Sequence, residues 1–551
     1  MKKSLFYLLF SVAIFSPAES FSQSQYPTPD QVGDHLQAIV KKHPSLATIQ
    51  SLTKTPSSND VWLVTLGSGD VANHPATAVI AGVKAQHLVG TETAIRLVDS
   101  ILSREDAAEL LSENTFYIVP SLNPDATEGY FAKLQNESYR TKSLYDNDRD
   151  GLMSEDSVED LDDNGMITAM IVESENGEYI KHPLDSRVVI KADAAKGEKG
   201  KYLLFSEGID NDKDGLLNED GQDGVDLNRN FTYKYKNWGV ESGHYPISEV
   251  ENRALLDFMY DAFNIHTVIS FGPNDNLYSP TTYTNKTRKG VDVDHKTVAD
   301  TAPKGGNGAD IAAMLKTDNI LASKVSEIYR ANDATANDIL AEKPLDGNFT
   351  EWAYYHYGRN SFETNVWSVD SEDERGSREV AYLMWADKNG IEDSAVAWSE
   401  VEHPDFKGKT VEVGSLAPYA LYTPKLELIE SQVDATIKTV VDIAELHPEV
   451  KLTVESEQLS KGVYRVSAKV ANVGEMPTAT SIGVQSYFVK YVRVELKLDG
   501  QNILQGLRLS TIPNLNAGEV SEFSWIIEGK GKFDIEAGSP QSGYVAETVT
   551  L

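Results

Sequence analysis

Three short acidic segments of the sequence have the residue types and spacing of calcium-binding loops. In each segment, oxygen-bearing side chains alternate with other residues and a glycine follows. The three sets are Asp146, Asp148, Asp150 and Gly151; Asp160, Asp162, Asn164 and Gly165; and Asp210, Asp212, Asp214 and Gly215. Alternating oxygens converge on one hard cation, and the glycine permits the sharp turn that this requires. We therefore predict calcium-stabilised loops with a structural role.

These segments differ from the standard twelve-residue calcium loop at its last position. A glutamate normally binds the ion there, but Ser157, Ile171 and Gly221 occupy that position here. The alternative interpretation is a solvated acidic surface without a cation. Three such segments in one region of the chain favour calcium, because unneutralised carboxylates would repel one another.

A second group of residues lies in segment 224–231, which reads Gly-Val-Asp-Leu-Asn-Arg-Asn-Phe. This segment resembles the signature of the carboxypeptidase A-like zinc carboxypeptidases. Four further segments match that family in the same order along the chain, namely 80–92, 123–125, 269–272 and 347–367. One motif alone would be weak evidence. Five ordered motifs over most of residues 25–445 make the chain similar to this family as a whole.

The resemblance implies a metallopeptidase mechanism. A catalytic zinc has three protein ligands and one open position for water. The metal polarises the scissile carbonyl and makes the water acidic, and a glutamate takes the proton of that water. An arginine and an asparagine hold the terminal carboxylate of the substrate, since a guanidinium matches that planar anion with two parallel hydrogen bonds.

The sequence departs from the family pattern at the zinc positions. The first ligand pair falls on Lys84 and His87, and the third ligand falls on Gly272. Lysine is a cation without an acceptor atom, and glycine has no side chain, so only His87 keeps a ligating group. One imidazole does not make a zinc site. We therefore predict that the zinc expected from the family has been lost.

The position of the family's catalytic glutamate falls on Asn365, whose amide has no useful basicity. Glu363 lies two residues earlier, on the same face of a strand. At ~3.3 Å per residue the displacement is roughly 7 Å, which is too far for a general base without rearrangement. We expect Glu363 to lie at the surface or in a salt bridge rather than to act as a relocated base.

The residues that would hold a terminal carboxylate are better retained. Asn228 and Arg229 match the family's Asn-Arg pair, and Arg140 lies where a second substrate-binding arginine is expected. The alternative for Arg229 is a structural ion pair. The family's substrate-capping tyrosine is missing from segment 341–346, where it would be expected.

Two functions fit these observations. The favoured one is a pseudoenzyme, a non-catalytic binding protein that retains a pocket for the carboxyl end of a peptide or protein. The alternative is an active metallocarboxypeptidase that takes part in proteolysis through relocated metal ligands. Metal analysis separates the two, because zinc favours the enzyme and calcium without zinc favours the binding protein.

The composition excludes several other classes. The chain of 551 residues carries a formal net charge of −34, which argues against nucleic acid or an anionic membrane surface as partner. Cysteine is absent, so disulfides and thiolate sites are excluded.

The chain divides into three parts. Lys2 and Lys3 precede an apolar run and then small residues, which predicts a signal peptide over 1–22 and export to the periplasm or the extracellular space. Residues 25–447 alternate strand-like and helix-like patterns and predict an α/β domain, a zinc-carboxypeptidase-like mixed sheet flanked by helices, with acidic calcium-loop insertions at about 146–220. Residues 449–551 alternate apolar and polar positions and predict an all-β, immunoglobulin-like sandwich. No later stretch resembles a membrane span.

The expected elements follow from the same patterns. We predict strands at 61–66, 76–83, 116–120 and 266–271, and helices at 91–104, from 248 onward and at 426–446. In the last hundred residues we predict strands at 450–454, 463–470, 492–498 and 520–527.

Overall fold

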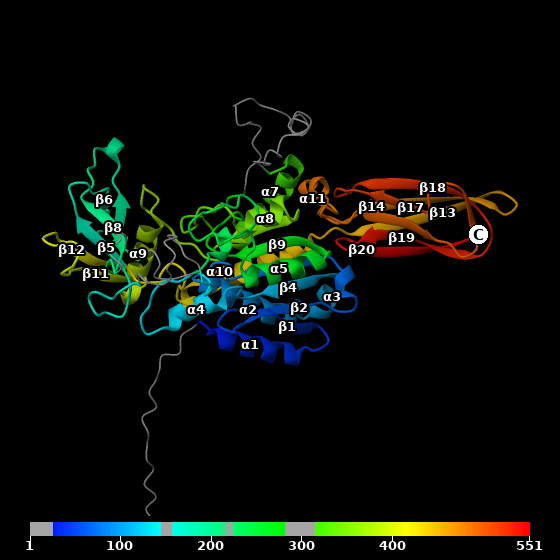
Figure 1. The fold of residues 1–551 in the computed structure, drawn as a ribbon. Coiled ribbons are helices and arrows are strands. Elements are labelled where there is room, and N and C mark those ends of the chain that lie inside the picture. Colours follow the sequence, from blue (N-terminus) through cyan, green and yellow to red (C-terminus); the bar gives the residue numbers. More distant parts are fainter. Residues whose placement is uncertain are drawn as a thin grey trace, which may run out of the picture.

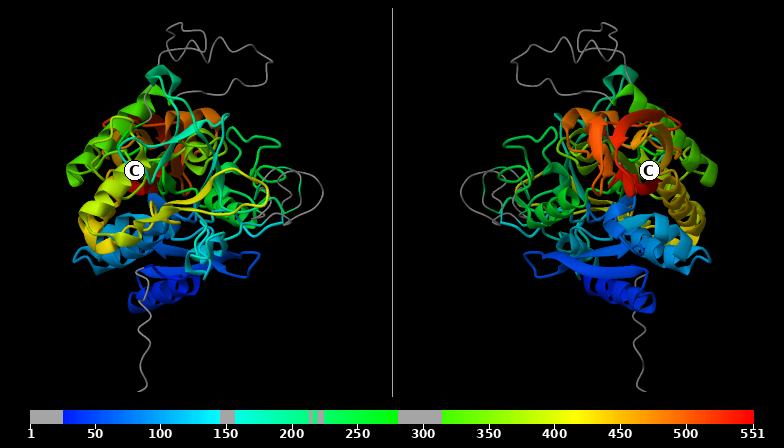
Figure 2. Two further views of the ribbon diagram at one scale, coloured as in Figure 1. Left: turned by 90° about the vertical axis from the view of Figure 1, so that its left-hand side faces the viewer. Right: turned by 90° about the vertical axis from the view of Figure 1, so that its right-hand side faces the viewer.

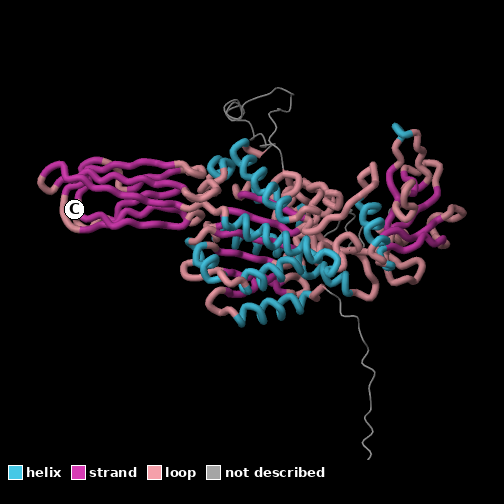
Figure 3. The backbone as a smooth tube through the Cα atoms, turned by 180° about the vertical axis from the view of Figure 1, so that it is seen from behind, coloured by secondary structure: helices cyan, strands magenta, loops and turns pink. Residues whose placement is uncertain are grey.

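The computed structural model describes residues 26–144, 157–211, 213, 215, 217–218, 224–280 and 314–551. The predicted signal peptide therefore lies outside the described residues. So do five of the predicted calcium ligands, Asp146, Asp148, Asp150, Asp212 and Asp214. The described chain forms three parts in a row, with a helix-covered sheet in the centre and strand-rich parts at the two ends (Figures 1 and 3).

The central sheet has six strands in the order β1-β2-β4-β3-β9-β10. The strands are β1 (Ala47–Lys54), β2 (Asp60–Leu66), β3 (Ala76–Ala81), β4 (Thr115–Val119), β9 (Ile265–Phe271) and β10 (Asn360–Thr364). β3, β4, β9 and β10 are parallel, and β2 runs antiparallel to both β1 and β4. This arrangement confirms the predicted mixed sheet. The parallel strands are buried on both faces, and β3 is almost wholly apolar, whereas β10 reads Asn-Ser-Phe-Glu-Thr and buries polar side chains.

Helices cover both faces of the central sheet. They are α1 (Pro29–Lys42), α2 (Leu88–Ser103), α3 (Ala107–Glu113), α4 (Pro124–Phe131), α5 (Val250–Asp261), α7 (Lys316–Asn332), α8 (Phe349–Tyr355) and α10 (Leu426–Glu445). A further helix, α9 (Arg378–Lys388), lies at one end of the molecule (Figure 1). Because successive side chains of a strand point to opposite faces, Val79 of β3 packs with α2 and α10, whereas Ala78 and Ile80 pack with α5 and α8. The sheet therefore separates two cores.

A second six-stranded sheet, not expected from the sequence, lies at one end of the molecule (Figure 1). Its order is β11-β12-β5-β8-β6-β7, and its strands are β5 (Ala169–Glu173), β6 (Tyr179–Lys181), β7 (Val189–Lys191), β8 (Tyr202–Ser206), β11 (Ala395–Glu400) and β12 (Val411–Leu416). The four strands β5 to β8 fall within the region predicted as acidic loop insertions. They escape sequence analysis because each is short and partners from beyond residue 394 complete the sheet.

The last hundred residues form two four-stranded antiparallel sheets, β13-β14-β18-β16 and β17-β15-β19-β20. The strands are β13 (Val450–Ser460), β14 (Val463–Asn472), β15 (Val492–Lys497), β16 (Asn502–Gln505), β17 (Leu509–Ile512), β18 (Val520–Glu528), β19 (Lys532–Ser539) and β20 (Gly543–Thr550). The inward-facing residues of both sheets form a single core around Trp525. These sheets extend away from one end of the central part (Figure 1), and the right-hand view of Figure 2 shows them end-on.

One helix of this region, α11 (Ser481–Ser486), departs from the all-β pattern and packs against the central part. Met476 and Ile482 join the core that lies under α2 and α10. Within the described part of the chain, no helix is both long and apolar enough to cross a membrane.

Candidate ligand site at the carboxyl edge of the central sheet

Three parallel strands bring the residues at the family's zinc and base positions together. Lys84 and His87 follow β3, Gly272 follows β9 and Asn365 follows β10. The carboxyl ends of neighbouring parallel strands meet at one edge of a sheet, which is the usual place for a ligand in such folds. Gly82 turns the chain at this edge with φ +71°, and a Cβ there would lie 2.8 Å from the Leu122 amide nitrogen. The turn directs Lys84 and His87 back over the sheet.

Lys84 is buried and forms an ion pair with Asp226, which is fully buried. Its Nζ also lies 4.4 Å from the ring centroid of Tyr139. Asp226 accepts a hydrogen bond from the Asn228 amide at 2.9 Å and so caps the short helical turn η3 (Leu227–Arg229). The ammonium group at the first family ligand position therefore fixes the segment that carries Asn228 and Arg229.

His87 is fully buried and bound to Asn365. The Nε2 of His87 lies 3.0 Å from Oδ1 of Asn365, and Nδ2 of Asn365 donates to the Trp367 carbonyl at 3.0 Å. Since the amide group thus presents an acceptor to the ring, Nε2 carries the proton. Burial lowers the pKa of His87 to about 4, so the ring is neutral at pH 7. His87, at a family zinc position, and Asn365, at the family base position, are therefore hydrogen-bonded to each other.

Gly272 faces the carboxylate of Glu363. A Cβ on Gly272 would lie 2.5 Å from Oε1 of Glu363, so the glutamate fills the space of a side chain at the third ligand position. Glu363 is buried and accepts hydrogen bonds from the Thr350 hydroxyl and the Asn274 amide, and burial raises its pKa. The expectation that Glu363 lies at the surface or in a salt bridge is therefore wrong. Although β10 is the last strand of the central sheet, all five of its residues are buried, so the Glu363 side chain is shielded from solvent.

The two arginines of the predicted carboxylate clamp share a carboxylate from the protein itself. Arg140 Nε donates to Oε1 of Glu241 at 2.9 Å, and Arg229 Nε lies 3.6 Å from Oε2 of Glu241 and 3.6 Å from Oδ2 of Asp226. Asn228 uses its Oδ1 to accept from the Phe349 amide at 2.9 Å. The ion pair considered for Arg229 is thus present, and Asn228 helps to start α8.

A second ion pair lies beside His87. Arg378 donates to Glu342 at 2.9 Å and to the Tyr422 hydroxyl at 3.1 Å, and the Tyr422 hydroxyl also contacts Glu342. The Tyr422 ring centroid is 6.3 Å from that of His87. Burial raises the pKa of Glu342, but Arg378, the Tyr422 hydroxyl and Lys84 together hold the pKa below its usual range.

Sequence reasoning overlooked several of these residues. Asp226 stands inside the 224–231 signature and could have been recognised there. Glu241 and Tyr422 stand outside every motif, and Glu342 stands in segment 341–346, where the family's tyrosine was expected. No signal in the sequence indicates that these three residues reach the site.

These residues do not fit a zinc ion. The ammonium group of Lys84 is a cation committed to Asp226, Gly272 offers no ligand, and the Nε2 of His87 is protonated toward Asn365. Among the described residues, one group of three carboxylates comes close enough to hold a metal ion, and it lies elsewhere, at Asp160, Asp162 and Glu207.

This carboxylate group combines one predicted acidic loop with a residue that the sequence did not suggest. The backbone turns at Asp163 and Gly165, whose φ values are +56° and +83°, and the amide of Gly165 donates to Asp160 at 2.7 Å. Glu207, directly after β8, accepts from the Leu161 amide at 2.7 Å. Asn164 uses its Oδ1 to accept from the Met166 amide. An all-carboxylate donor set of this kind suits calcium rather than zinc.

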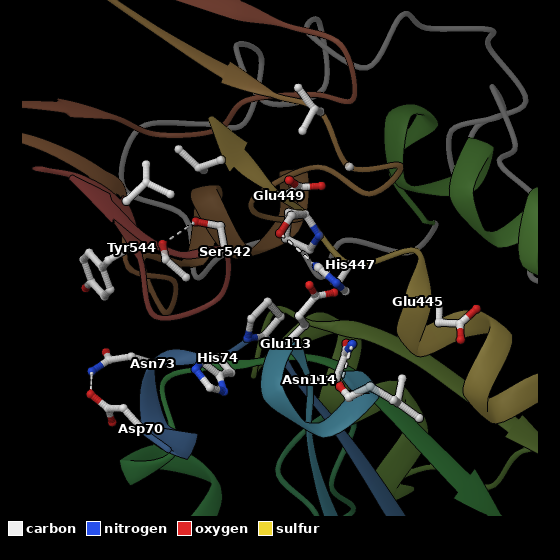
Figure 4. A pocket seen from close by; sticks show the side chains of 18 of the residues that line it. Asp70, Asn73, His74, Glu113, Asn114, Glu445, His447, Glu449, Ser542 and Tyr544 are labelled. Atoms are coloured by element: carbon white, nitrogen blue, oxygen red, sulfur yellow. Dashed lines mark hydrogen bonds between the residues drawn. The ribbon is translucent and has the colours of Figure 1, made fainter. Parts of the chain in front are cut away.

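A cleft of about 1170 Å³ lies at the junction with the C-terminal sheets (Figure 4). Most of its charged lining is acidic, including Glu113, Glu445 and Glu449, with His74 and His447 nearby. None of the residues at the family's zinc, base or clamp positions lines this cleft. It is therefore separate from the site at the sheet edge.

Comparison with known proteins finds similarity to carboxypeptidases over most of the chain. The family profile described as zinc carboxypeptidase matches residues 32–394, and one described as a domain of unknown function matches residues 450–550. Carboxypeptidase B of Astacus astacus is 24% identical over 103 residues, which cover 18% of this chain and 34% of that protein. The chain thus matches about a third of the length of this curated relative.

Two solved structures are also similar to this chain at low sequence identity. Thrombin-activatable fibrinolysis inhibitor is similar with a TM-score of 0.40 and 14% identity, covering 78% of this chain and 80% of that one. Carboxypeptidase A of Helicoverpa armigera has a TM-score of 0.39 and 11% identity, covering 76% and 73%.

Proposed function

The chain belongs to the zinc carboxypeptidase family, and from the residues at its site we propose that it binds the carboxyl end of a peptide without hydrolysing it. The observation that carries this proposal is the buried ion pair of Lys84 with Asp226 at the first family ligand position. Hydrolysis in the family depends on a metal that polarises the carbonyl and acidifies water. Lys84 is held in this ion pair, and its neighbours are the neutral ring of His87, which carries its proton on Nε2, and the amide of Asn365. None of these groups polarises a carbonyl or acidifies water.

Binding of an anion is supported by the charges around η3. Lys84, Arg140 and Arg229 contribute three positive charges, and Asp226 and Glu241 contribute two negative ones. Among these five groups, one positive charge is in excess. Arg229 is about one-third exposed and is the member of this group that a ligand reaches first. A guanidinium at this position can form two parallel hydrogen bonds to a carboxylate.

The test measures hydrolysis and binding on the same purified protein. We expect no release of C-terminal amino acids and no stoichiometric zinc. Calorimetry is expected to show weak, micromolar-class binding of an N-acetylated tripeptide with a free carboxyl end, with a binding free energy of about −8 kcal/mol or weaker. We expect no binding of the corresponding amide. Arg229→Ala should abolish the difference, whereas Arg465→Ala in the C-terminal sheets removes the same charge and should leave it unchanged.

Two results would overturn the proposal. Equal affinities for the free acid and the amide would remove the carboxylate clamp. Zinc-dependent release of C-terminal residues would instead establish the alternative, an active metallocarboxypeptidase with relocated ligands.

We further propose that the Asp160 loop holds calcium and that residues 1–22 direct export. The convergence of Asp160, Asp162 and Glu207 supports the first of these. The order of charged, apolar and small residues supports the second. Sequencing the amino terminus of the mature protein tests export, since an unprocessed Met1 in an extracytoplasmic fraction would contradict cleavage.

A further inference from the structure

Glu241 lies between the two arginines of the clamp with both of its oxygens engaged. Its Oε1 accepts from Arg140 Nε and from the Tyr139 hydroxyl, each at 2.9 Å, and its Oε2 faces Arg229 Nε at 3.6 Å. The carboxylate is buried. Burial raises the pKa of Glu241, but Arg140, the Tyr139 hydroxyl and Arg229 together bring the pKa below its usual range, so the group is charged at pH 7. A peptide's terminal carboxylate would need these same donors.

The loop that carries Glu241 is held mainly by polar contacts. Glu241 has φ +62°, a left-handed conformation that disfavours residues other than glycine, and its carbonyl accepts from the Asp226 amide at 3.0 Å. Its neighbours Trp238 and Val240 leave 76% and 61% of their surface exposed. Little apolar surface anchors this loop, so it is held by the ionic contacts of Glu241 together with hydrogen bonds such as that from Asn230 Nδ2 to the Ser242 carbonyl at 2.8 Å.

We infer that Glu241 is an internal substitute for the carboxylate of the ligand. It occupies the clamp while no ligand is bound, and a free carboxyl end must displace it to bind. This inference rests on the proposed function and adds the residue that sets its affinity. Displacement of Glu241 leaves Arg140 and Arg229 without a negative partner. A peptide amide carries no charge and cannot compensate them, whereas a free carboxylate can, so displacement of Glu241 selects for free acids.

The first experiment compares Glu241→Gln with the unmodified protein in binding of the N-acetylated tripeptide acid and its amide. Glutamine keeps the shape of the side chain but removes its charge, so it competes less well for Arg140 and Arg229. We expect the Kd for the acid to fall about tenfold or more and the amide to remain without binding. Asp257→Asn, on the exposed face of α5, removes the same charge elsewhere and should leave the Kd unchanged.

The second experiment remains informative if a variant is poorly folded. Glu241→Ala opens a space of carboxylate size between two cations, and added sodium acetate should fill it. We expect acetate to raise the melting temperature of this variant by several degrees more than that of the unmodified protein or of Asp257→Asn, with sodium chloride at equal ionic strength as the reference.

The outcomes separate this inference from the proposed function. If the unmodified protein prefers the acid through Arg229 but Glu241→Gln binds no tighter, the inference is wrong and the proposed function stands. If neither protein prefers the acid but acetate selectively stabilises Glu241→Ala, Glu241 does occupy an anion site and the peptide function is wrong. Absence of both effects overturns both.

Discussion

At the scale of single residues, the polar groups of the site are paired with other groups of the protein itself. Lys84 pairs with Asp226, His87 with Asn365, and Glu363 fills the space beside Gly272. Each of these contacts buries polar atoms, and a buried polar atom costs folding free energy unless it is paired. Removal of one partner should therefore lower the free energy of unfolding by more than the lost contact itself contributes.

Replacing Lys84 by methionine tests this dependence. The change leaves the fully buried Asp226 carboxylate without its main cation, and breaking a buried pair in this way typically costs about 3–5 kcal/mol. We expect the free energy of unfolding in urea to fall by that order. Lys54→Met, which breaks the exposed pair with Asp60, is the matched control and should cost at most about 1 kcal/mol. Equal effects of the two variants would show that the Lys84 pair has no special role.

His87 should make stability depend on pH in a defined direction. Its pKa in the folded protein is about 4, below the value of ~6.5 in an unfolded chain. The unfolded chain therefore binds the proton first, so the stability that the neutral ring supports is complete above pH 6.5 and is lost as the pH falls toward 4.

The difference in unfolding free energy between the unmodified protein and His87→Gln isolates this effect, since other groups titrate in both. We expect the difference to shift by about 2 kcal/mol against the unmodified protein between pH 7.5 and pH 5. Urea unfolding at several pH values measures it. A difference independent of pH would mean that the ring is not buried as a neutral group.

At the scale of elements, strands from distant parts of the sequence complete sites that local motifs only begin. The loop of Asp160 and Asp162 is visible as a motif, but its third carboxylate comes from Glu207, which follows β8. Thr168 binds the same glutamate through its amide at 2.9 Å, beside the start of β5. Pairing of β5 with β8 thus brings Glu207 to the loop.

Calcium should stabilise this part of the molecule. Chelation leaves three converging carboxylates unneutralised, so we expect the melting temperature to fall by several degrees in EDTA and to recover with added calcium but not magnesium. Glu207→Gln should reduce the response, whereas Asp257→Asn should not. A melting curve that EDTA leaves unchanged would remove calcium from this site.

At the scale of the whole molecule, the C-terminal sheets are tied to the central part through α11 and its flanks. Asp318 of α7 is buried and accepts from the amides of Ser481 and Ile482 at 2.8 and 3.2 Å. The buried Arg359 donates to the Phe488 carbonyl at 3.2 Å. These contacts are polar and buried, so the region after residue 449 contributes to the core of the central part.

Removing the C-terminal region should therefore destabilise the central part. A chain that ends at residue 447 loses the partners of Asp318 and exposes the surface covered by Met476 and Ile482. We expect it to melt at a clearly lower temperature than the full chain, and the full chain to unfold in one transition. Differential scanning calorimetry measures both. Equal melting temperatures, or two separate transitions in the full chain, would show that the two regions are independent units.

The sequence by itself determined the family, the mixed sheet, four of its strands (β2, β3, β4 and β9), the helices α2, α5 and α10, and the strands β13, β14, β15 and β18 of the C-terminal sheets. The signals for these are local, because hydrophobic periodicity and motif spacing are set by neighbouring residues and need no knowledge of the fold. The absence of zinc ligands at Lys84 and Gly272 could be predicted for the same reason, since side-chain type alone decides it.

Only the tertiary structure decided which groups meet at these positions. The pairs Lys84 with Asp226, Arg140 with Glu241 and Gly272 with Glu363 join residues far apart in the sequence. Their meeting depends on strand order and loop conformation, and the left-handed backbone at Glu241 has no signature in its residue type. The second sheet was missed for a related reason, because strands of three to six residues are stabilised by distant partners rather than by their own pattern.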